Sequence, residues 1–163
     1  MISLTDKKKL VALVLESLEH SRKTMAEAAA ESSAAATHPE SRAEDPKDMR
    51  STEVSYLARG QAMRVEELDE QIARLRYFES GVFGPKDPVA AGAFVEVEDD
   101  DESRWYFVLP YGGGTEVTYA GKTVTVVTGT SPLGRAMLGR SVGDDVELVV
   151  RGKKRELVLV AIA

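Results

Sequence analysis

The sequence predicts an α+β protein in which an N-terminal antiparallel α-helical coiled-coil hairpin precedes a small antiparallel β domain with one short helix. Composition changes along the chain. Residues 1–78 are rich in Ala, Glu, Arg and Leu and contain one glycine, Gly60, whereas residues 82–163 contain nearly all the glycines and most of the Val, Tyr and Phe. Glycines and a proline at Gly81–Pro85 mark the end of the helices. The expected parts are a hairpin over residues 1–79 with its tip at about 37–49, a linker over 80–92 and a C-terminal domain over 93–163.

Two helices are predicted by apolar or small residues that recur at alternating spacings of three and four, which is the pattern of a coiled-coil seam. The first seam is Val11, Val14, Leu18, Ser21, Met25, Ala28, Ser32 and Ala35, and the second is Val54, Leu57, Gln61, Val65, Leu68, Ile72 and Leu75. Thr5 and Asp6 are placed to cap the first helix. Pro39 and Pro46 separate the helices, because proline disfavours helix in the preceding residue.

The simplest arrangement is a hairpin of two helices, each about 30 residues and hence roughly 45 Å long. The alternative is that both helices belong to a compact bundle, but the sequence offers no third long helix to complete one. In the first helix the seam residues shrink from Val and Leu to Ala and Ser toward the tip. We therefore expect the tip end to bury less apolar area and to be less stable.

The second half predicts strands and one short helix. Ser131 is placed as an N-cap, Pro132 as the first helical residue and Gly139 just past the end. The acidic run Glu98–Glu102 is expected to be a solvated turn, and Arg151–Lys154 a hairpin turn. The predicted strands are 94–97, 105–109, 123–127, 146–150 and 157–162.

Composition excludes several classes of protein. The chain has no cysteine, which excludes disulfides and Cys-ligated zinc and fits a reducing cytoplasm. Its net charge of −6 argues against a protein that coats nucleic acid. No apolar run approaches the ~20 residues of a membrane span, so no membrane partner is expected. His20 and His38 are the two histidines, both in or beside the hairpin, so an independent enzyme is not expected.

Several segments resemble the GreA/GreB transcription elongation factors. In the segment Thr130–Leu148, a serine-proline opens a short helix and a valine-glycine-aspartate turn follows, as in that family. Phe83-Gly84 before Ala93–Asp99 is similar to the connector and first strand of GreB, and Tyr56–Gln61 is similar to the second helix of the family's coiled coil. The resemblance implies an FKBP-like C-terminal domain behind an N-terminal coiled coil.

The resemblance also implies a function. The chain would be a monomeric, cytoplasmic accessory factor of bacterial RNA polymerase and not itself an enzyme. Its hairpin would enter the polymerase's secondary channel, with the globular domain at the channel rim. Carboxylates at the tip would help to hold an Mg²⁺ ion shared with the polymerase, so that the polymerase cleaves backtracked RNA near its 3′ end. Mg²⁺ often uses only one or two protein carboxylates, so an acidic tip suits this role.

The tip departs from the family's motif of an aspartate followed three residues later by a glutamate. Alignment on Ala58-Arg59 places Asp48 on the aspartate but Ser51 on the glutamate, and alignment on Tyr56 supplies neither carboxylate. Glu44, Asp45 and Asp48 form a displaced acidic cluster. We take these three as the candidate catalytic residues, with Asp45 and Asp48 as the metal ligands. The alternative is that both aspartates are loop and N-cap residues.

The docking segment departs in a similar way. The family has an acidic residue before the serine-proline pair, and here that residue is Thr130. Thr130, Ser131 and Pro132 are the candidate partner-binding residues, although Ser131 and Pro132 also have a structural role as cap and first turn.

Other functions stay open. A factor that docks without stimulating cleavage would modulate or inhibit the polymerase. An adaptor coiled coil would bind an unrelated partner. A prolyl isomerase would need an aromatic pocket, but Trp105, Tyr106 and Phe107 are successive strand residues that face opposite sides, so they cannot all line one.

Overall fold

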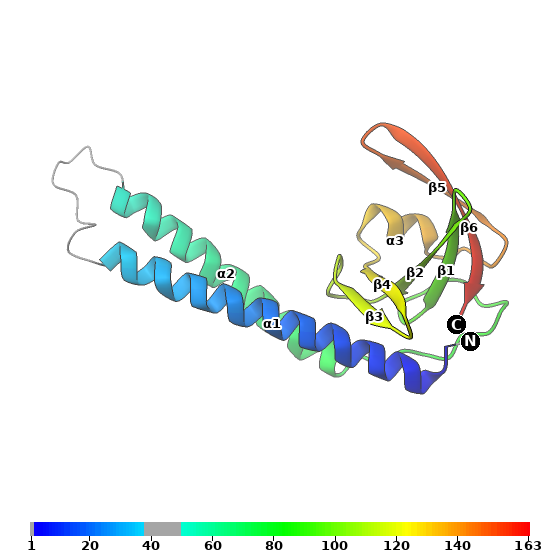
Figure 1. Ribbon diagram of the computed structural model, residues 1–163, viewed down its shortest axis with the longest axis horizontal. Helices are drawn as coiled ribbons and strands as arrows, with labels where there is room; N and C mark the ends of the chain where they lie inside the picture. Colours follow the sequence, from blue (N-terminus) through cyan, green and yellow to red (C-terminus); the bar gives the residue numbers. More distant parts are fainter. Residues whose placement is uncertain (1, 38–49) are drawn as a thin grey trace. The chain divides into compact units, whose positions relative to one another are not determined.

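The computed structural model describes residues 2–37 and 50–163, and the predicted fold class is confirmed. Two helices, α1 (Leu4–Thr37) and α2 (Arg50–Arg76), precede a six-stranded sheet that carries a third, short helix (Figure 1). The chain forms two compact units. One is Leu18–Arg74, and the other joins the residues up to Ser17 with Leu75–Ala163. Within the described residues, no helix is long and apolar enough to cross a membrane.

The start of α1 is held by a capping box between Ser3 and Asp6. The backbone N–H of Asp6 donates to the Ser3 hydroxyl at 3.2 Å, and the backbone N–H of Ser3 donates to the Asp6 carboxylate at 3.0 Å. The expected cap at Thr5 was wrong, because Thr5 already lies inside the first turn. Asp6 does take part in the cap, as the third helical residue.

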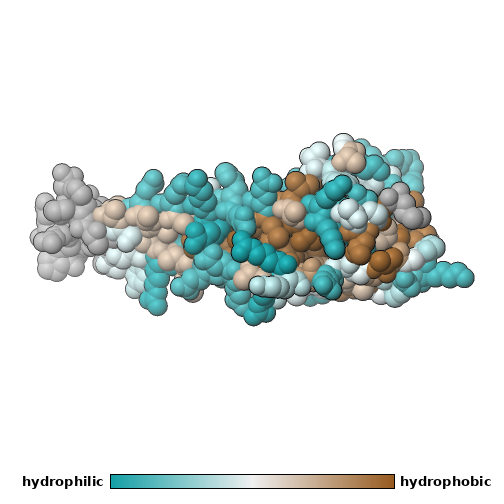
Figure 2. All heavy atoms as spheres, turned by 90° about the horizontal axis from the view of Figure 1, so that it is seen from below, coloured by the Kyte–Doolittle hydropathy of each residue, from teal (hydrophilic) through white to brown (hydrophobic). Residues whose placement is uncertain are grey.

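Burial along α2 falls toward the tip, as the sequence predicts. Leu68, Ile72 and Leu75 are at most 5% exposed, whereas Leu57 is 57% exposed. In α1 the buried residues nearest its start are Lys7, Leu10, Val14 and Leu18, while Val11 is half-buried and Ser21 and Ala35 are exposed. On the face that Figure 2 shows, hydrophilic side chains cover much of the two helices, and apolar side chains gather toward the N-terminal half of α1. Arg22 joins the two helices through an ion pair with Asp69 at 2.8 Å.

The sheet has the strand order β3-β4-β2-β1-β6-β5. Its strands are β1 (Phe94–Asp99), β2 (Glu102–Val108), β3 (Glu116–Tyr119), β4 (Lys122–Val127), β5 (Asp145–Val150) and β6 (Lys153–Ile162). The sheet is antiparallel, as predicted, except where β2 pairs parallel with β4. The exception arises because β3, a strand absent from the prediction, crosses to the edge and β4 returns between it and β2.

Two-residue turns close the three hairpins β1–β2, β3–β4 and β5–β6. Arg151 and Gly152 have φ of 51° and 77°, Asp100 and Asp101 have φ of 51° and 65°, and Ala120 and Gly121 have φ of 50° and 76°. Positive φ at both central residues is typical of the turns that match the twist of a β-hairpin. The expected hairpin turn after β5 is therefore confirmed.

The acidic run before β2 differs from the prediction at one residue. Asp99 is 3% exposed, and its carboxylate pairs with Arg155 of β6 and with Arg104 of β2, the latter at 3.4 Å. The prediction of a fully solvated turn was wrong for this residue, because two arginines on neighbouring strands neutralise it where it is buried. Such a pairing joins three strands at one end of the sheet.

The main core lies between the sheet and α3 (Pro132–Met137). Met137 of α3 is fully buried among inward-facing residues of the strands, including Val95, Val97, Leu157 and Leu159. The opposite face of the sheet carries a second apolar set. Phe94 is paired with Phe107, and Glu96 with Trp105, so all four side chains lie on that face.

Candidate functional site

The predicted tip residues lie outside the described part of the chain. Glu44, Asp45 and Asp48 fall between Thr37, where α1 ends, and Arg50, where α2 begins. Within the described residues, no group of three or more His, Cys, Asp or Glu side chains could hold a metal ion. The metal site therefore stays a prediction from the sequence.

Ser131 is the N-cap of α3, as predicted. Its hydroxyl accepts a hydrogen bond from the backbone N–H of Gly134 at 3.0 Å and donates one to the carbonyl of Thr128 at 2.8 Å. Pro132 is the first helical residue, where its missing N–H costs nothing. Because the Ser131 hydroxyl is engaged within the chain, the side chains of Thr130 and Pro132 are the exposed members of the docking trio.

Gly134 is required by the close approach of a neighbouring loop. A Cβ atom at this position would lie 1.9 Å from the carbonyl oxygen of Thr128. The same oxygen accepts the hydrogen bonds from the hydroxyl and the backbone N–H of Ser131. The Ser131 cap and the glycine at position 134 therefore both depend on the close position of the Thr128 carbonyl.

The docking trio borders an open groove of about 540 Å³ beside α3. Tyr106, Thr125 and Val127 from the sheet line it, together with Leu133 of α3 and Leu148 and Val150 of β5. No charged side chain is among the groove's lining residues in the described structure. Trp105 instead lines a cavity on the other face of the sheet, and Phe107 is fully buried. The aromatic residues of β2 are thus divided between the two faces, as predicted.

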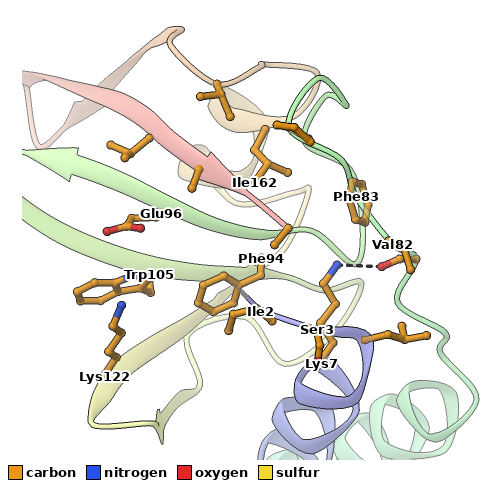
Figure 3. A pocket seen from close by; sticks show the side chains of 17 residues that line it. Ile2, Ser3, Lys7, Val82, Phe83, Phe94, Glu96, Trp105, Lys122 and Ile162 are labelled. Carbon is orange, nitrogen blue, oxygen red and sulfur yellow. Dashed lines mark hydrogen bonds between the residues drawn. The ribbon is translucent and has the colours of Figure 1, made fainter.

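The cavity on the other face also measures about 540 Å³. Residues 2–4 and Lys7 line it from the start of α1, and residues 81–83 and Pro85 line it from the connector. The sheet contributes Phe94, Glu96, Trp105 and Lys122, among others (Figure 3).

Lys7 is the most deeply buried charged side chain of this cavity, at 1% exposure. Its ammonium donates a hydrogen bond to the carbonyl of Gly81 at 2.8 Å and lies 4.5 Å from the centre of the Phe83 ring. Burial lowers the pKa of Lys7 to about 8, because desolvation disfavours the charged form. Lys7 is not among the residues predicted from the sequence, although it precedes Leu10 and Val14 at seam spacing.

Asp6 and Tyr119 form a second contact between the start of α1 and the sheet. The Tyr119 hydroxyl donates a hydrogen bond to the Asp6 carboxylate. Hydrogen bonds from the Ser3 side chain, Tyr119 and the Ser3 backbone hold the pKa of Asp6 well below its usual value. The hydrogen bond to Asp6 raises the pKa of Tyr119. No local sequence signal indicated this pair.

Residues 84–163, about half of the chain, match the family model of the GreA/GreB transcription elongation factor C-terminal domain. The C-terminal domain belongs to the GreA/GreB family. A curated relative, the transcription elongation factor GreA of Allorhizobium ampelinum, is 30% identical over 102 residues, which are 61% of this chain. The chain spans about 60% of the length of that relative.

Similar solved structures include the GreA factor homologue Gfh1 of Thermus thermophilus, at 22% identity and a TM-score of 0.39 over 91% of this chain and 94% of that one. Gfh1 of Thermus aquaticus is 23% identical, with a TM-score of 0.40 over 90% and 92% of the two chains. A GreA/GreB factor of Nitrosomonas europaea is 20% identical, with a TM-score of 0.37 over 63% and 91%.

The GreA/GreB domain contains α3 with its docking trio and the uncharged groove beside it. It also supplies the wall of the second cavity that is formed by the sheet. Lys7 and Asp6, by contrast, come from α1, outside the residues that the family model matches.

Proposed function

We propose that the chain is a transcription elongation factor that binds bacterial RNA polymerase through its secondary channel and stimulates cleavage of backtracked transcripts. The match of residues 84–163 to the GreA/GreB C-terminal domain carries the proposal. The helices α1 and α2, of 34 and 27 residues, support it, because a narrow helical hairpin suits entry into a channel. The factor would act in the cytoplasm as a monomer, and the hydrolysis itself would belong to the polymerase.

The tip would supply the carboxylates. Asp45 and Asp48, with Glu44 beside them, would hold an Mg²⁺ ion shared with the polymerase, since this ion prefers oxygen ligands and often uses one or two carboxylates. When bound, the ion would stabilise negative charge on the attacking and leaving oxygens. The carboxylates would also accept hydrogen bonds from a water molecule and orient it toward the RNA. Lys47 and Arg50 would weaken the local negative charge.

The domain would dock at the channel rim through Thr130 and Pro132. Both are exposed beside the uncharged groove, while Ser131 keeps the first turn of α3 in place. Without the acidic residue that the family has at position 130, this contact would depend less on charge and more on shape.

A second function is favoured by the altered tip. Because neither alignment of the tip supplies both family carboxylates, a factor that occupies the channel without stimulating cleavage is the competing proposal. Such a factor would modulate or inhibit transcription.

A cleavage assay on a stalled, backtracked elongation complex with Mg²⁺ distinguishes the cleavage-stimulating factor from the non-cleaving one. Under the first proposal, the wild-type protein accelerates release of the short 3′ RNA fragment. The double variant Asp45→Ala with Asp48→Ala loses about tenfold or more of that acceleration, or roughly 1.4 kcal/mol of transition-state stabilisation per factor of ten, and still binds. Glu66→Ala is the matched control, because Glu66 is an exposed carboxylate of α2 away from the tip.

The same samples contain labelled factor, so that its binding to the polymerase is measured alongside cleavage. Binding without accelerated cleavage would support the non-cleaving modulator. Absence of binding to the polymerase would contradict both proposals.

A further inference from the structure

The cavity between the start of α1, the connector and the sheet contains a buried cation without an anionic partner. Lys7 is 1% exposed and projects from α1 toward the connector (Figure 3). Its one hydrogen-bond acceptor in the described structure is the neutral carbonyl of Gly81, and its other close neighbour is the ring of Phe83. A buried ammonium that lacks an anion is costly, so an incoming carboxylate would find a favourable partner here.

The other walls of the cavity are mainly apolar. Phe94, Ile162 and the indole of Trp105 line the side formed by the sheet, and Val82 and Phe83 line the side formed by the connector. Its volume of about 540 Å³ lies within the range of sites that enclose small organic molecules, which is roughly 300–1,000 Å³. Pockets of that kind combine apolar walls with a few polar groups that fix the ligand's orientation.

Charged groups of both signs belong to the lining. Two lysines, Lys7 and Lys122, line the cavity together with the side chain of Glu96 and the residue Ala163. The Lys122 ammonium lies 4.3 Å from the centre of the Trp105 ring, at the part of the cavity that Figure 3 places away from Lys7. Lys7 is the more buried of the two cations, because Lys122 is exposed, and its ammonium lies over the Phe83 ring.

We propose that this cavity binds a small apolar monocarboxylate, with its carboxylate on the ammonium of Lys7 and its apolar body against Phe94, Trp105 and Ile162. The site is independent of the proposed action on RNA polymerase. A ligand there would contact α1, the connector and the sheet at once, so its binding would stabilise the packing of the first turns of α1 against the domain.

Trp105 gives the site a specific readout, because it is the one tryptophan of the chain and lines the cavity. The probes are 4-phenylbutyrate and its neutral analogue 4-phenyl-1-butanol, titrated into the full chain and followed by tryptophan fluorescence and calorimetry. We expect saturable binding of the carboxylate with a Kd on the order of 1 mM or tighter, and binding of the alcohol at least about tenfold weaker.

Three variants locate the anionic contact. Lys7→Met should bind both probes equally, because it keeps the length and apolar stem of the side chain and removes the charge. Lys122→Met tests the cavity's other lysine and should keep most of the preference for the carboxylate. Lys8→Met is the surface control, since Lys8 is exposed and does not line this cavity.

Equal affinity of the wild type for the two probes, or no saturable binding of the carboxylate, would overturn the proposal. Loss of the preference in Lys122→Met but not in Lys7→Met would overturn the placement of the carboxylate. If Lys7→Met fails to fold, the comparison of the two probes on wild type and Lys122→Met decides the outcome.

Discussion

The hydroxyl of Tyr119 donates a hydrogen bond to the carboxylate of Asp6, which lies 113 residues earlier in the chain. Asp6 also closes the capping box of α1 with Ser3. One carboxylate therefore accepts hydrogen bonds from the backbone N–H and the hydroxyl of Ser3 at the start of the helix, and it joins that start to strand β3.

Replacement of Tyr119 by phenylalanine should raise the pKa of Asp6 toward its usual value of 3.8. Because the folded-state pKa of Asp6 is lowered, its contribution to stability is present above 3.8 and is lost as pH falls through the folded-state value. Tyr119→Phe should therefore lower the free energy of unfolding at neutral pH, and its difference from wild type should shrink in acid. An NMR titration of the Asp6 carboxyl and denaturation at several pH values measure both effects.

Tyr77→Phe is the control for the loss of a phenolic hydroxyl, since Tyr77 is 88% exposed. An unchanged Asp6 pKa in Tyr119→Phe would contradict the prediction. A deficit of Tyr119→Phe that stays the same at every pH would show that the phenol acts through packing instead.

Contacts between residues distant in sequence, such as Asp6 and Tyr119, separate what the sequence could predict from what it could not. The spacing of apolar residues and helix capping depend on neighbouring residues only. The two helices, the Ser131 cap and the β5–β6 hairpin therefore followed from short patterns of residues. The strand β3 did not, because its four residues lie between glycine-containing turns and are too few to show an alternation. Without β3, the parallel pairing of β2 with β4 could not be foreseen.

The candidate functional residues also divide into those that short sequence patterns predict and those that they do not. The docking trio could be placed because serine and proline have fixed preferences at the start of a helix. The burial of Lys7, its bond to Gly81 at a separation of 74 residues and the neutralisation of Asp99 by Arg155 depend on chain segments that are distant in sequence. Local spacing alone does not determine such contacts.

Lys7 makes the free energy of unfolding depend on pH in the alkaline range. The pKa of Lys7 is about 8 in the folded chain, below its usual value of 10.5. In that interval the unfolded chain binds more protons, so this contribution to stability is fully present above 10.5 and is lost as pH falls through about 8. The interval corresponds to roughly 3 kcal/mol at about 1.4 kcal/mol per pKa unit.

In Lys7→Met, the free energy of unfolding should not show the increase between pH 8 and 10.5 that Lys7 causes in the wild type. The free energy of unfolding of the variant minus that of wild type should therefore fall by up to roughly 3 kcal/mol between pH 8 and 10.5, as followed by urea denaturation. Lys8→Met should show no such trend, because Lys8 is exposed. A difference that stays level across the interval would mean that the Lys7 ammonium is not desolvated.

Gly134→Ala should destabilise the C-terminal domain by about 1–3 kcal/mol, because its methyl group would meet the Thr128 carbonyl oxygen at 1.9 Å and displace the loop or α3. Gly60→Ala is the matched control in a helix. No atom lies within 4 Å of the added methyl there, so this change should stabilise α2 by about 0.5–1 kcal/mol. Denaturation followed by Trp105 fluorescence reports the first effect, and circular dichroism reports the second. A neutral Gly134→Ala would show that the loop moves freely.

The hairpin should lose stability unevenly when its leucines are truncated. Leu68 is 3% exposed, so Leu68→Ala removes buried methyl groups and leaves a cavity, at a cost of about 2–5 kcal/mol. Leu57 occupies an equivalent seam position nearer the tip but is 57% exposed, so Leu57→Ala should change stability by no more than about 0.5 kcal/mol. Thermal unfolding by circular dichroism compares the two, and amide hydrogen exchange should be slower around Leu68 than around Leu57. Equal losses would mean that the two helices pack as closely at the tip as near Leu68, and the small side chains toward the end of α1 would then need another explanation.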